Sequence, residues 1–158
     1  MVPSDLSLRD LIFYHDEEQP QAIIAKVYEL EDSEDPYGGL HFLEEREGII
    51  FDCYASMIDA SPIPISSEIL IANGFKHFKE NNKEFGWDGI EHFNKGIENG
   101  YVTVWPTGKE GIWHIKISIT NNNLNVEIKA IHELQHALRV AHLKELADSL
   151  KIEKGGAQ

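Results

Sequence analysis

The sequence is short of cysteine, of long apolar runs and of glycine-rich loops, and each shortage excludes a class of protein. Cys53 is the only cysteine, so the chain cannot form an internal disulfide bond. No apolar run approaches the roughly 20 residues of a membrane-spanning helix, and the N-terminus lacks the basic and apolar regions of a secretory signal. No loop has the glycine spacing that binds phosphates or dinucleotides. We therefore expect a cytoplasmic protein without a cofactor.

Basic residues are also scarce. Lysine and arginine number 14 against 27 aspartates and glutamates, a formal net charge of -13. This charge repels the phosphates of nucleic acids and anionic lipids, so we expect no direct binding of either. The excess lies at one end of the chain. Residues 1–62 hold 15 acidic and 3 basic side chains, a net charge of -12, whereas residues 63–158 hold 12 acidic and 11 basic, a net charge of -1.

The acidic end of the chain has two interpretations. Surface carboxylates often serve only to keep a protein soluble. Alternatively, one acidic face attracts a basic partner, such as a nucleic-acid-binding protein whose Lys/Arg groove the carboxylates occupy. The candidate partner-binding residues are Glu29, Glu31, Asp32, Glu34, Asp35, Glu44, Glu45 and Glu47.

The first part of the chain, residues 1–62, has the pattern of a small antiparallel β-sheet or barrel. Short apolar runs, spaced about ten residues apart, alternate with polar turns. Cys53 lies in one of these runs and is expected to be a small core residue rather than a nucleophile. Pro62 and Pro64 predict an extended linker, because proline fixes its own φ and disfavours helix in the residue before it. The chain is therefore divided into an acidic β-rich part, 1–62, and a second part, 63–158, which could share one core.

The second part mixes helix and strand signals. Ser66 or Ser67 can cap a short helix at residues 68–72, which Asn73-Gly74 can end in the left-handed conformation. Residues 101–105 and 113–119 predict a β-hairpin, and the segment 76–100 has no clear periodicity. Apolar residues from 131 onward recur at helical spacing and predict a long helix that begins between Asn125 and Lys129. The predicted fold class is α+β: a small N-terminal antiparallel sheet or barrel, then a β-hairpin packed against a long C-terminal helix.

The predicted helix contains His132-Glu133-Leu134-Gln135-His136, which matches the zinc-binding pattern H-E-x-x-H. Two histidines four residues apart can bind zinc, and the glutamate between them can activate a metal-bound water. His142 completes the three-histidine spacing of the metzincins. If the predicted helix is continuous, the three histidines cannot converge on one metal ion. Arg139 stands where metzincins have a chain-turning glycine, and a continuous helix places His142 about 80° around its axis from His132.

A zinc site would therefore need a ligand from elsewhere, and His114 is the best candidate. No methionine follows Met57, so the methionine turn of the metzincins is absent. The pattern also arises by chance in helices rich in Glu, His and Leu. We therefore assign no catalytic, cofactor-binding or metal-binding residue.

Two segments carry a resemblance to a known group of proteins. They are residues 62–75, PIPISSEILIANGF, and residues 128–138, IKAIHELQHAL. Together they resemble a family of small uncharacterised proteins of bacterial prophages and mobile elements, which have a PIPLTEEIL-x-x-NGF-like connector and a closing IKYVHxLQ-type helix. In that pattern the positions of Glu133 and His136 are often other residues. The present chain departs from the pattern in its longer and more acidic N-terminal part.

The resemblance implies a phage-like setting, in which small acidic proteins are commonly inhibitors of host defence nucleases, anti-CRISPR proteins included. The leading hypothesis is a non-enzymatic protein-binding module that docks on a basic host protein. One alternative is a small zinc-dependent hydrolase with His132 and His136 as ligands and Glu133 as base. Another is a structural or assembly factor of the mobile element.

Overall fold

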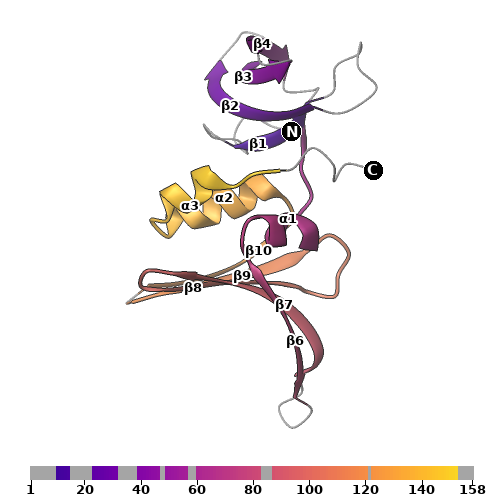
Figure 1. The fold of residues 1–158 in the computed structure, drawn as a ribbon, viewed down its shortest axis with the longest axis vertical. Coiled ribbons are helices and arrows are strands. Elements are labelled where there is room, and N and C mark those ends of the chain that lie inside the picture. Colours follow the sequence, from indigo (N-terminus) through magenta and orange to yellow (C-terminus); the bar gives the residue numbers. More distant parts are fainter. Residues whose placement is uncertain are drawn as a thin grey trace. The chain divides into compact units, whose positions relative to one another are not determined.

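A computed structural model gives the fold for residues 10–14, 23–31, 39–46, 49–56, 60–82, 87–120 and 122–152. The chain divides into two units, residues 1–63 and residues 64–156. Each unit contains one five-stranded sheet, and all strand pairs in the described ranges are antiparallel (Figure 1). None of the helices within these ranges is long and apolar enough to cross a membrane.

The first unit is a meander that returns on itself. Its strands are β1 (Leu11–Tyr14), β2 (Ile23–Glu31), β3 (Gly39–Arg46), β4 (Ile49–Ser56) and β5 (Ala60–Pro62). Their order in the sheet is β4-β3-β2-β1-β5, so β1 to β4 pair in sequence order and β5 comes back to pair with β1. The apolar runs of residues 1–62 lie on these strands, and β4 forms one edge of the sheet.

The core of the first unit forms on one face of this sheet. On β2, Ala25 and Val27 are buried while Lys26 between them is exposed, which is the alternation of a strand with one covered face. Ile12, Phe42 and Ala60 complete the buried cluster. Tyr14 and Cys53 are partly buried against the cluster, so Cys53 has the packing role that its apolar run predicts.

The second unit is a strand meander with three short helices. Its elements are α1 (Ser67–Ala72), β6 (Lys76–Asn82), β7 (Trp87–Ile97), β8 (Gly100–Pro106), β9 (Trp113–Ile119), β10 (Asn122–Ile128), α2 (Ile131–Val140) and α3 (Lys144–Ser149). The strands lie in the order β10-β9-β8-β7-β6. The predicted hairpin is confirmed as β8 and β9, with Val104 opposite Ile115. The segment without clear periodicity forms a second hairpin, β6 and β7.

The helices lie on one side of the second sheet (Figure 1). Hydrophobic residues fill the core between them; they are Leu70, Phe93, Val102, Val104, Ile115, Ile117, Ile131, Leu134 and Leu138, all almost fully buried. On β9 the buried Ile115 and Ile117 alternate with the exposed Lys116. One sheet face is therefore covered and carries the core.

The signals that delimit α1 are confirmed. Ser66 is the N-cap, and its hydroxyl accepts a hydrogen bond of 3.3 Å from the backbone N–H of Ile69. Gly74 adopts φ 78°, and the N–H of Phe75 donates to the carbonyl of Leu70 at 3.0 Å, the geometry of a helix end closed by a left-handed glycine. The backbone N–H and the Ser66 hydroxyl hold the pKa of Glu68 below its usual value.

The predicted α+β class with a long C-terminal helix is wrong. The structure is mostly β, with two five-stranded antiparallel sheets, and its longest described helix, α2, has 10 residues. Residues 125–128, where the long helix was expected to begin, belong to strand β10. Leu124, Val126 and Ile128 alternate along this strand, and their period of two prevailed over the helical spacing that starts at Ile131.

The helix also ends early, at Val140, because the chain turns at His142. This residue adopts a left-handed φ of 62°. The N–H of Leu143 donates to the carbonyl of Leu138 at 2.8 Å, and the N–H of His142 donates to the carbonyl of Arg139 at 3.0 Å. This is the double hydrogen bond of the Schellman motif, which usually has glycine at the left-handed position. Because histidine is not the usual residue at this position, the sequence does not indicate that the helix ends here.

Candidate functional site

Four of the eight predicted partner-binding residues lie on strands of the first sheet. Glu29 and Glu31 are on β2, and Glu44 and Glu45 are on β3. The side chains of these four residues are outside the part of the chain that the structure describes. The remaining predicted residues, Asp32, Glu34, Asp35 and Glu47, lie wholly outside the described residues.

The strand register separates these acidic positions into two groups. Glu29 lies opposite His41 and Glu31 opposite Gly39, toward the end of the β2–β3 ladder where residues 32–38 connect the two strands. Glu44 and Glu45 lie at the other end of β3, near the 47–48 connection to β4. Along the strands, the positions of Glu29 and Glu31 therefore lie toward one end of the sheet, and those of Glu44 and Glu45 lie toward the other.

Strand β4 runs along the whole of β3, so it passes both ends of the sheet at which acidic positions lie. Glu44 pairs with Phe51 and Glu45 with Ile50, whereas Gly39, opposite Glu31, pairs with Ser56. Among the described residues, β4 pairs only with β3 and stands at one end of the strand order.

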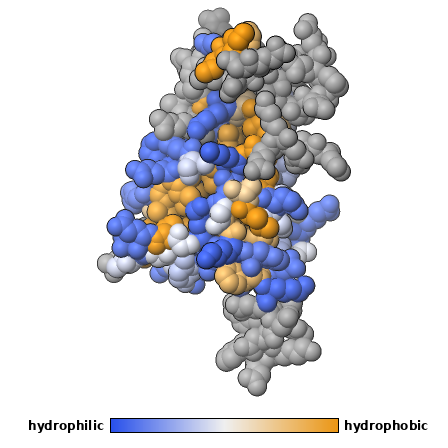
Figure 2. Space-filling view, in the orientation of Figure 1, coloured by the Kyte–Doolittle hydropathy of each residue, from blue (hydrophilic) through white to orange (hydrophobic). Residues whose placement is uncertain are grey.

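This edge strand is also unusually apolar at its surface. Four large side chains of β4 are exposed: Ile49 by 60%, Ile50 by 66%, Phe51 by 43% and Tyr54 by 52%. Figure 2 shows hydrophobic side chains at the surface over β4. Exposed apolar residues that gather in one place mark interaction surfaces more often than scattered ones do.

On one face of the sheet, Asp52 and Tyr54 of β4 contact His41 of β3. His41 on β3 lies 5.1 Å from the Tyr54 ring, in an edge-on arrangement. Its Nδ1 lies 3.8 Å from a carboxylate oxygen of Asp52, which is itself well exposed. Gly39 leaves space for the Tyr54 side chain, because a Cβ atom at position 39 would collide with the Tyr54 ring. The Tyr54 ring is thus supported from β3 while half of the residue stays accessible.

The sequence does not single out this edge. The run Ile49-Ile50-Phe51 belongs to one of the short apolar runs that predict β-strands, and such a run does not tell which strand lies at the edge of the sheet. Strand order decides which strand is left at the edge, and it depends on pairing between distant segments. The available signal was the run itself, since three consecutive apolar residues place side chains on both faces of a strand.

The H-E-x-x-H segment lies on α2, where its residues support the helix. The carboxylate of Glu133 accepts hydrogen bonds from the backbone N–H groups of Lys129 and Ala130, the latter at 3.3 Å. These contacts satisfy donors at the start of the helix. His132 is buried, and its ring centroid lies 6.0 Å from that of His136.

The histidines proposed as further ligands lie apart from this pair. His142 is exposed in the turn after α2. His114 alternates along β9 with the buried Ile115, and its ring packs 5.1 Å from that of Trp105. Within the described ranges, no three His, Cys, Asp or Glu side chains are grouped closely enough to hold a metal ion.

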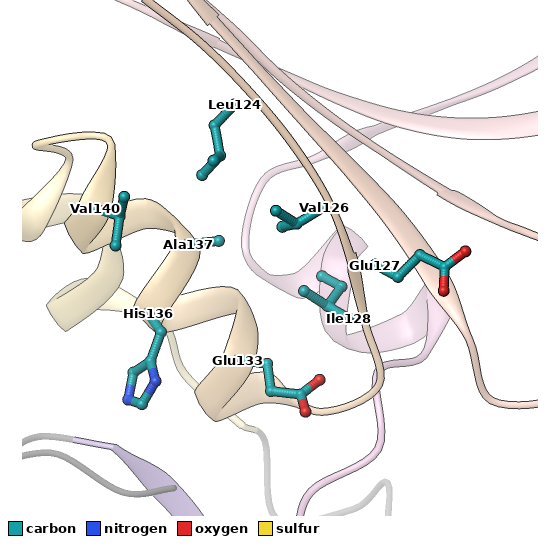
Figure 3. A pocket seen from close by; sticks show the side chains of 8 residues that line it. All are labelled: Leu124, Val126, Glu127, Ile128, Glu133, His136, Ala137 and Val140. Atoms are coloured by element: carbon teal, nitrogen blue, oxygen red, sulfur yellow. The ribbon is translucent and has the colours of Figure 1, made fainter. Parts of the chain in front are cut away.

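A groove of about 430 Å³ runs between α2 and β10. Its lining comprises Leu124, Val126, Glu127, Ile128, Glu133, His136, Ala137 and Val140. Figure 3 shows the aliphatic side chains on its two walls, with the His136 imidazole and the Glu133 carboxylate extending in different directions. These two polar groups therefore do not converge on one point in the groove.

Comparison of the chain with protein-family models, curated proteins and solved structures finds no match. Function is therefore inferred from the residues of the chain itself. The exposed apolar side chains of β4 and the acidic positions on β2 and β3 form the candidate site.

Proposed function

We propose that this chain is a non-enzymatic protein-binding module whose acidic first unit docks on a basic partner. The observation that carries the proposal is the charge of residues 1–62, a net -12 from 15 acidic and 3 basic side chains, against -1 for the rest of the chain. The boundary of this charge falls within one residue of the boundary between the two units, 63 and 64. The excess of acidic residues therefore belongs to the first of the two units.

An acidic unit of this kind attracts a basic surface over a distance before contact. Complementary charge raises the association rate and disfavours partners of like charge, although it adds less to the final affinity. A basic surface in a cell is commonly one that binds nucleic acid. The partner class that fits this charge is therefore a nucleic-acid-binding protein, whose Lys/Arg surface the acidic unit would occupy in place of phosphates.

The concrete form of the proposal is an anti-defence inhibitor from a phage or mobile element, of the anti-CRISPR type, acting in the cytoplasm on a host defence nuclease. This specific setting rests on the resemblance of residues 62–75 and 128–138 to prophage proteins. The electrostatic proposal stands without it.

Charge reversal in one unit, compared with an equal reversal in the other, tests the proposal. The full chain with Glu44→Lys, Glu45→Lys and Glu47→Lys is used to capture proteins from bacterial lysate. The matched control carries Glu98→Lys, Glu110→Lys and Glu145→Lys, which change three exposed acids of the second unit. We expect the first variant to lose basic, nucleic-acid-binding proteins that the parent and the control retain.

Raised salt and added single-stranded DNA should release the same captured proteins, because both compete with the carboxylates for the basic surface. Equal capture by the parent and by the first-unit variant, together with capture that persists in high salt, would contradict electrostatic docking.

A further inference from the structure

The second sheet has one face that carries the core and one face that is accessible. The buried residues of its strands, such as Phe93, Val104 and Ile115, share the face on which the helices lie (Figure 1). The residues that alternate with them point to the opposite face. On that opposite face, Phe78 of β6 is 44% exposed and Tyr101 of β8 is 41% exposed. We call this surface the open face.

The strand register arranges the side chains of the open face in rows that cross the sheet. Residues that lie opposite each other on neighbouring strands have side chains on the same face. One row passes through all five strands, and we call it the polar row; it comprises Lys76, Asn94, Thr103, Lys116 and Asn125. Two residues along the strands on one side of it lies a shorter row, Gly96, Tyr101, Ser118 and Asn123.

Aromatic rings lie on the other side of the polar row. Phe78 and His92, opposite each other on β6 and β7, are stacked with their ring centroids 5.3 Å apart. Trp105 and His114, opposite each other on β8 and β9, have centroids 5.1 Å apart. Each of these four residues stands two positions from a member of the polar row. The polar row is therefore flanked by these rings on one side and by Tyr101 on the other.

The polar groups of the open face are mostly groups that both donate and accept hydrogen bonds. Side-chain amides and hydroxyls have this property, whereas lysine and arginine only donate. No arginine occurs on the five strands of the second sheet. A phosphate only accepts hydrogen bonds and is matched by donors, but the hydroxyl groups of a sugar both donate and accept. The groups that match a sugar in this way are Asn94, Asn123, Asn125, Thr103, Ser118 and Tyr101.

The charge of the open face also favours a neutral ligand. Its exposed lysines, Lys76 and Lys116, are partly offset by the exposed Glu127, which lies opposite His114. Residues 63–158 hold a net charge of -1 and the whole chain -13, so a polyanion would be repelled. A neutral ligand experiences no such repulsion.

Two polar atoms of the open face indicate that its ligand is polar. Among the residues that the structure describes, Oδ1 of Asn94 and Nδ1 of His114 are buried without a hydrogen-bond partner. The great majority of buried polar atoms in proteins have a partner. Rotation of either side chain about its last bond would present its polar atom to a bound molecule. These atoms therefore favour a ligand with hydroxyl groups over an apolar one.

We propose that the open face of the second sheet binds a neutral oligosaccharide. Its hydroxyl groups pair with the polar row, and its C–H groups stack on exposed rings such as Phe78 and Tyr101, whose faces carry partial negative charge. Neighbouring strands lie about 4.8 Å apart, a spacing close to the length of one sugar unit in an extended chain. Successive sugars therefore meet successive strands. This site goes beyond the proposed function and does not depend on it, because it lies on the other unit.

The direct test is calorimetric titration of the full chain with cellohexaose, maltohexaose and chitohexaose. We expect at least one of the three to bind, with an affinity that added salt does not change. Phe78→Ala with Tyr101→Ala removes two exposed rings of the open face. The matched control, Phe51→Ala with Tyr54→Ala, removes the same residue types at similar exposure, 43% and 52%, from the first unit. We expect the open-face variant to bind at least about tenfold more weakly and the control to bind unchanged.

A second variant tests the polar row without removing a ring. Thr103→Val replaces the hydroxyl of a half-buried residue by a methyl group, and valine is also β-branched and favours strands. We expect this variant to bind the oligosaccharide about fivefold more weakly, the effect of one lost hydrogen bond. It provides an independent readout if the double variant of the open face folds poorly.

Three outcomes overturn the inference. The first is that none of the three oligosaccharides binds at millimolar concentration. The second is an equal loss of binding in the open-face variant and in its control, which would place the sugar elsewhere. The third is that a single-stranded oligothymidylate binds in place of the oligosaccharides, more weakly in high salt and in the open-face variant, which would identify nucleic acid as the ligand. Capture of basic proteins by the first unit is a separate measurement, so the proposed function stands or fails independently.

Discussion

The left-handed conformation of His142 sets the length of α2 and the positions of its histidines. A φ of 62° is unfavourable for a residue with a Cβ atom, although histidine tolerates it better than β-branched residues do. Because the chain turns here, His142 leaves the helix that carries His132 and His136. The left-handed turn thus has a structural role that does not depend on a metal.

This role predicts that His142→Gly stabilises the protein. Glycine adopts the left-handed conformation without strain, so we expect the free energy of unfolding to rise by about 0.5–1 kcal/mol. Urea denaturation followed by tryptophan fluorescence reports this change, since Trp87, Trp105 and Trp113 all lie in the second unit. Loss of stability, with release of stoichiometric zinc from protein purified without added metal, would instead show that His142 is a ligand.

Gly100 illustrates a second constraint at the scale of one residue. A Cβ atom at this position would collide with the backbone carbonyl oxygen of Ser118 on the neighbouring strand, whereas a Cβ atom at Gly96 would meet nothing within 4 Å. Backbone cannot move aside as a flexible side chain can. The requirement for glycine at position 100 comes from the pairing of β8 with β9.

The two glycines therefore form a matched pair of test sites. We expect Gly100→Ala to lower the free energy of unfolding by about 1–3 kcal/mol, because the strands must separate locally. Gly96→Ala should leave it unchanged or raise it slightly. Thermal unfolding of the two variants, monitored by tryptophan fluorescence, compares them directly, and similar melting temperatures would contradict the steric argument.

At the scale of elements, local signals predicted some parts of the fold and missed others. The caps of α1 were readable because Ser66 and Asn73-Gly74 act on backbone groups a few residues away. The hairpin of β8 and β9 was readable from its alternation. The assignment of 125–128 to helix failed because a short apolar alternation is ambiguous beside a helical repeat. The exposure of β4 follows from strand order, which no local pattern determines.

Asn73 links two elements that are distant in the sequence. Its side-chain N–H group donates to the carbonyl of Ile69 at 2.8 Å and to that of Lys151 at 2.7 Å. Its side-chain oxygen accepts from the N–H of Lys151 at 2.8 Å. The amide therefore joins the end of α1 to the backbone that follows α3.

Replacement of this amide should loosen that connection. We expect Asn73→Ala to lower the free energy of unfolding by about 1–2 kcal/mol, since each lost hydrogen bond contributes about 1 kcal/mol. Asn73→Asp retains the acceptor for Lys151 and should lose less. Chemical denaturation ranks the three proteins, and hydrogen exchange at Lys151 should accelerate most in the alanine variant. An alanine variant as stable as the parent would show that solvent replaces these bonds at no net cost.

At the scale of the whole molecule, the two units differ in charge far more than in architecture. Each has a five-stranded antiparallel sheet, yet residues 1–62 hold a net charge of -12 and residues 63–158 a net charge of -1. Like charges destabilise the folded state of the unit that contains them through mutual repulsion. We therefore expect charge repulsion to lower the stability of the first unit, whereas the second unit has nearly balanced charge.

This difference predicts that salt stabilises one unit selectively. Raising the ionic strength from about 0.01 M to about 0.15 M shortens the Debye length from about 30 Å to about 8 Å and screens the repulsion among the carboxylates. We expect the first unit to gain about 1 kcal/mol, since each exposed charge pair contributes only a few tenths. The second unit should be almost unaffected.

The chain has a separate probe for each unit, so this prediction can be measured without labels. Cys53 is the only cysteine and is partly buried in the first unit, so the reaction of its thiol with a disulfide reagent reports the opening of that unit. The three tryptophans report the second unit. Added salt should move the urea midpoint of thiol exposure upward and leave that of fluorescence in place. Equal shifts of both midpoints would show that repulsion among carboxylates destabilises the first unit no more than the second. That result would weaken the argument that the first unit retains its carboxylates to bind a basic partner.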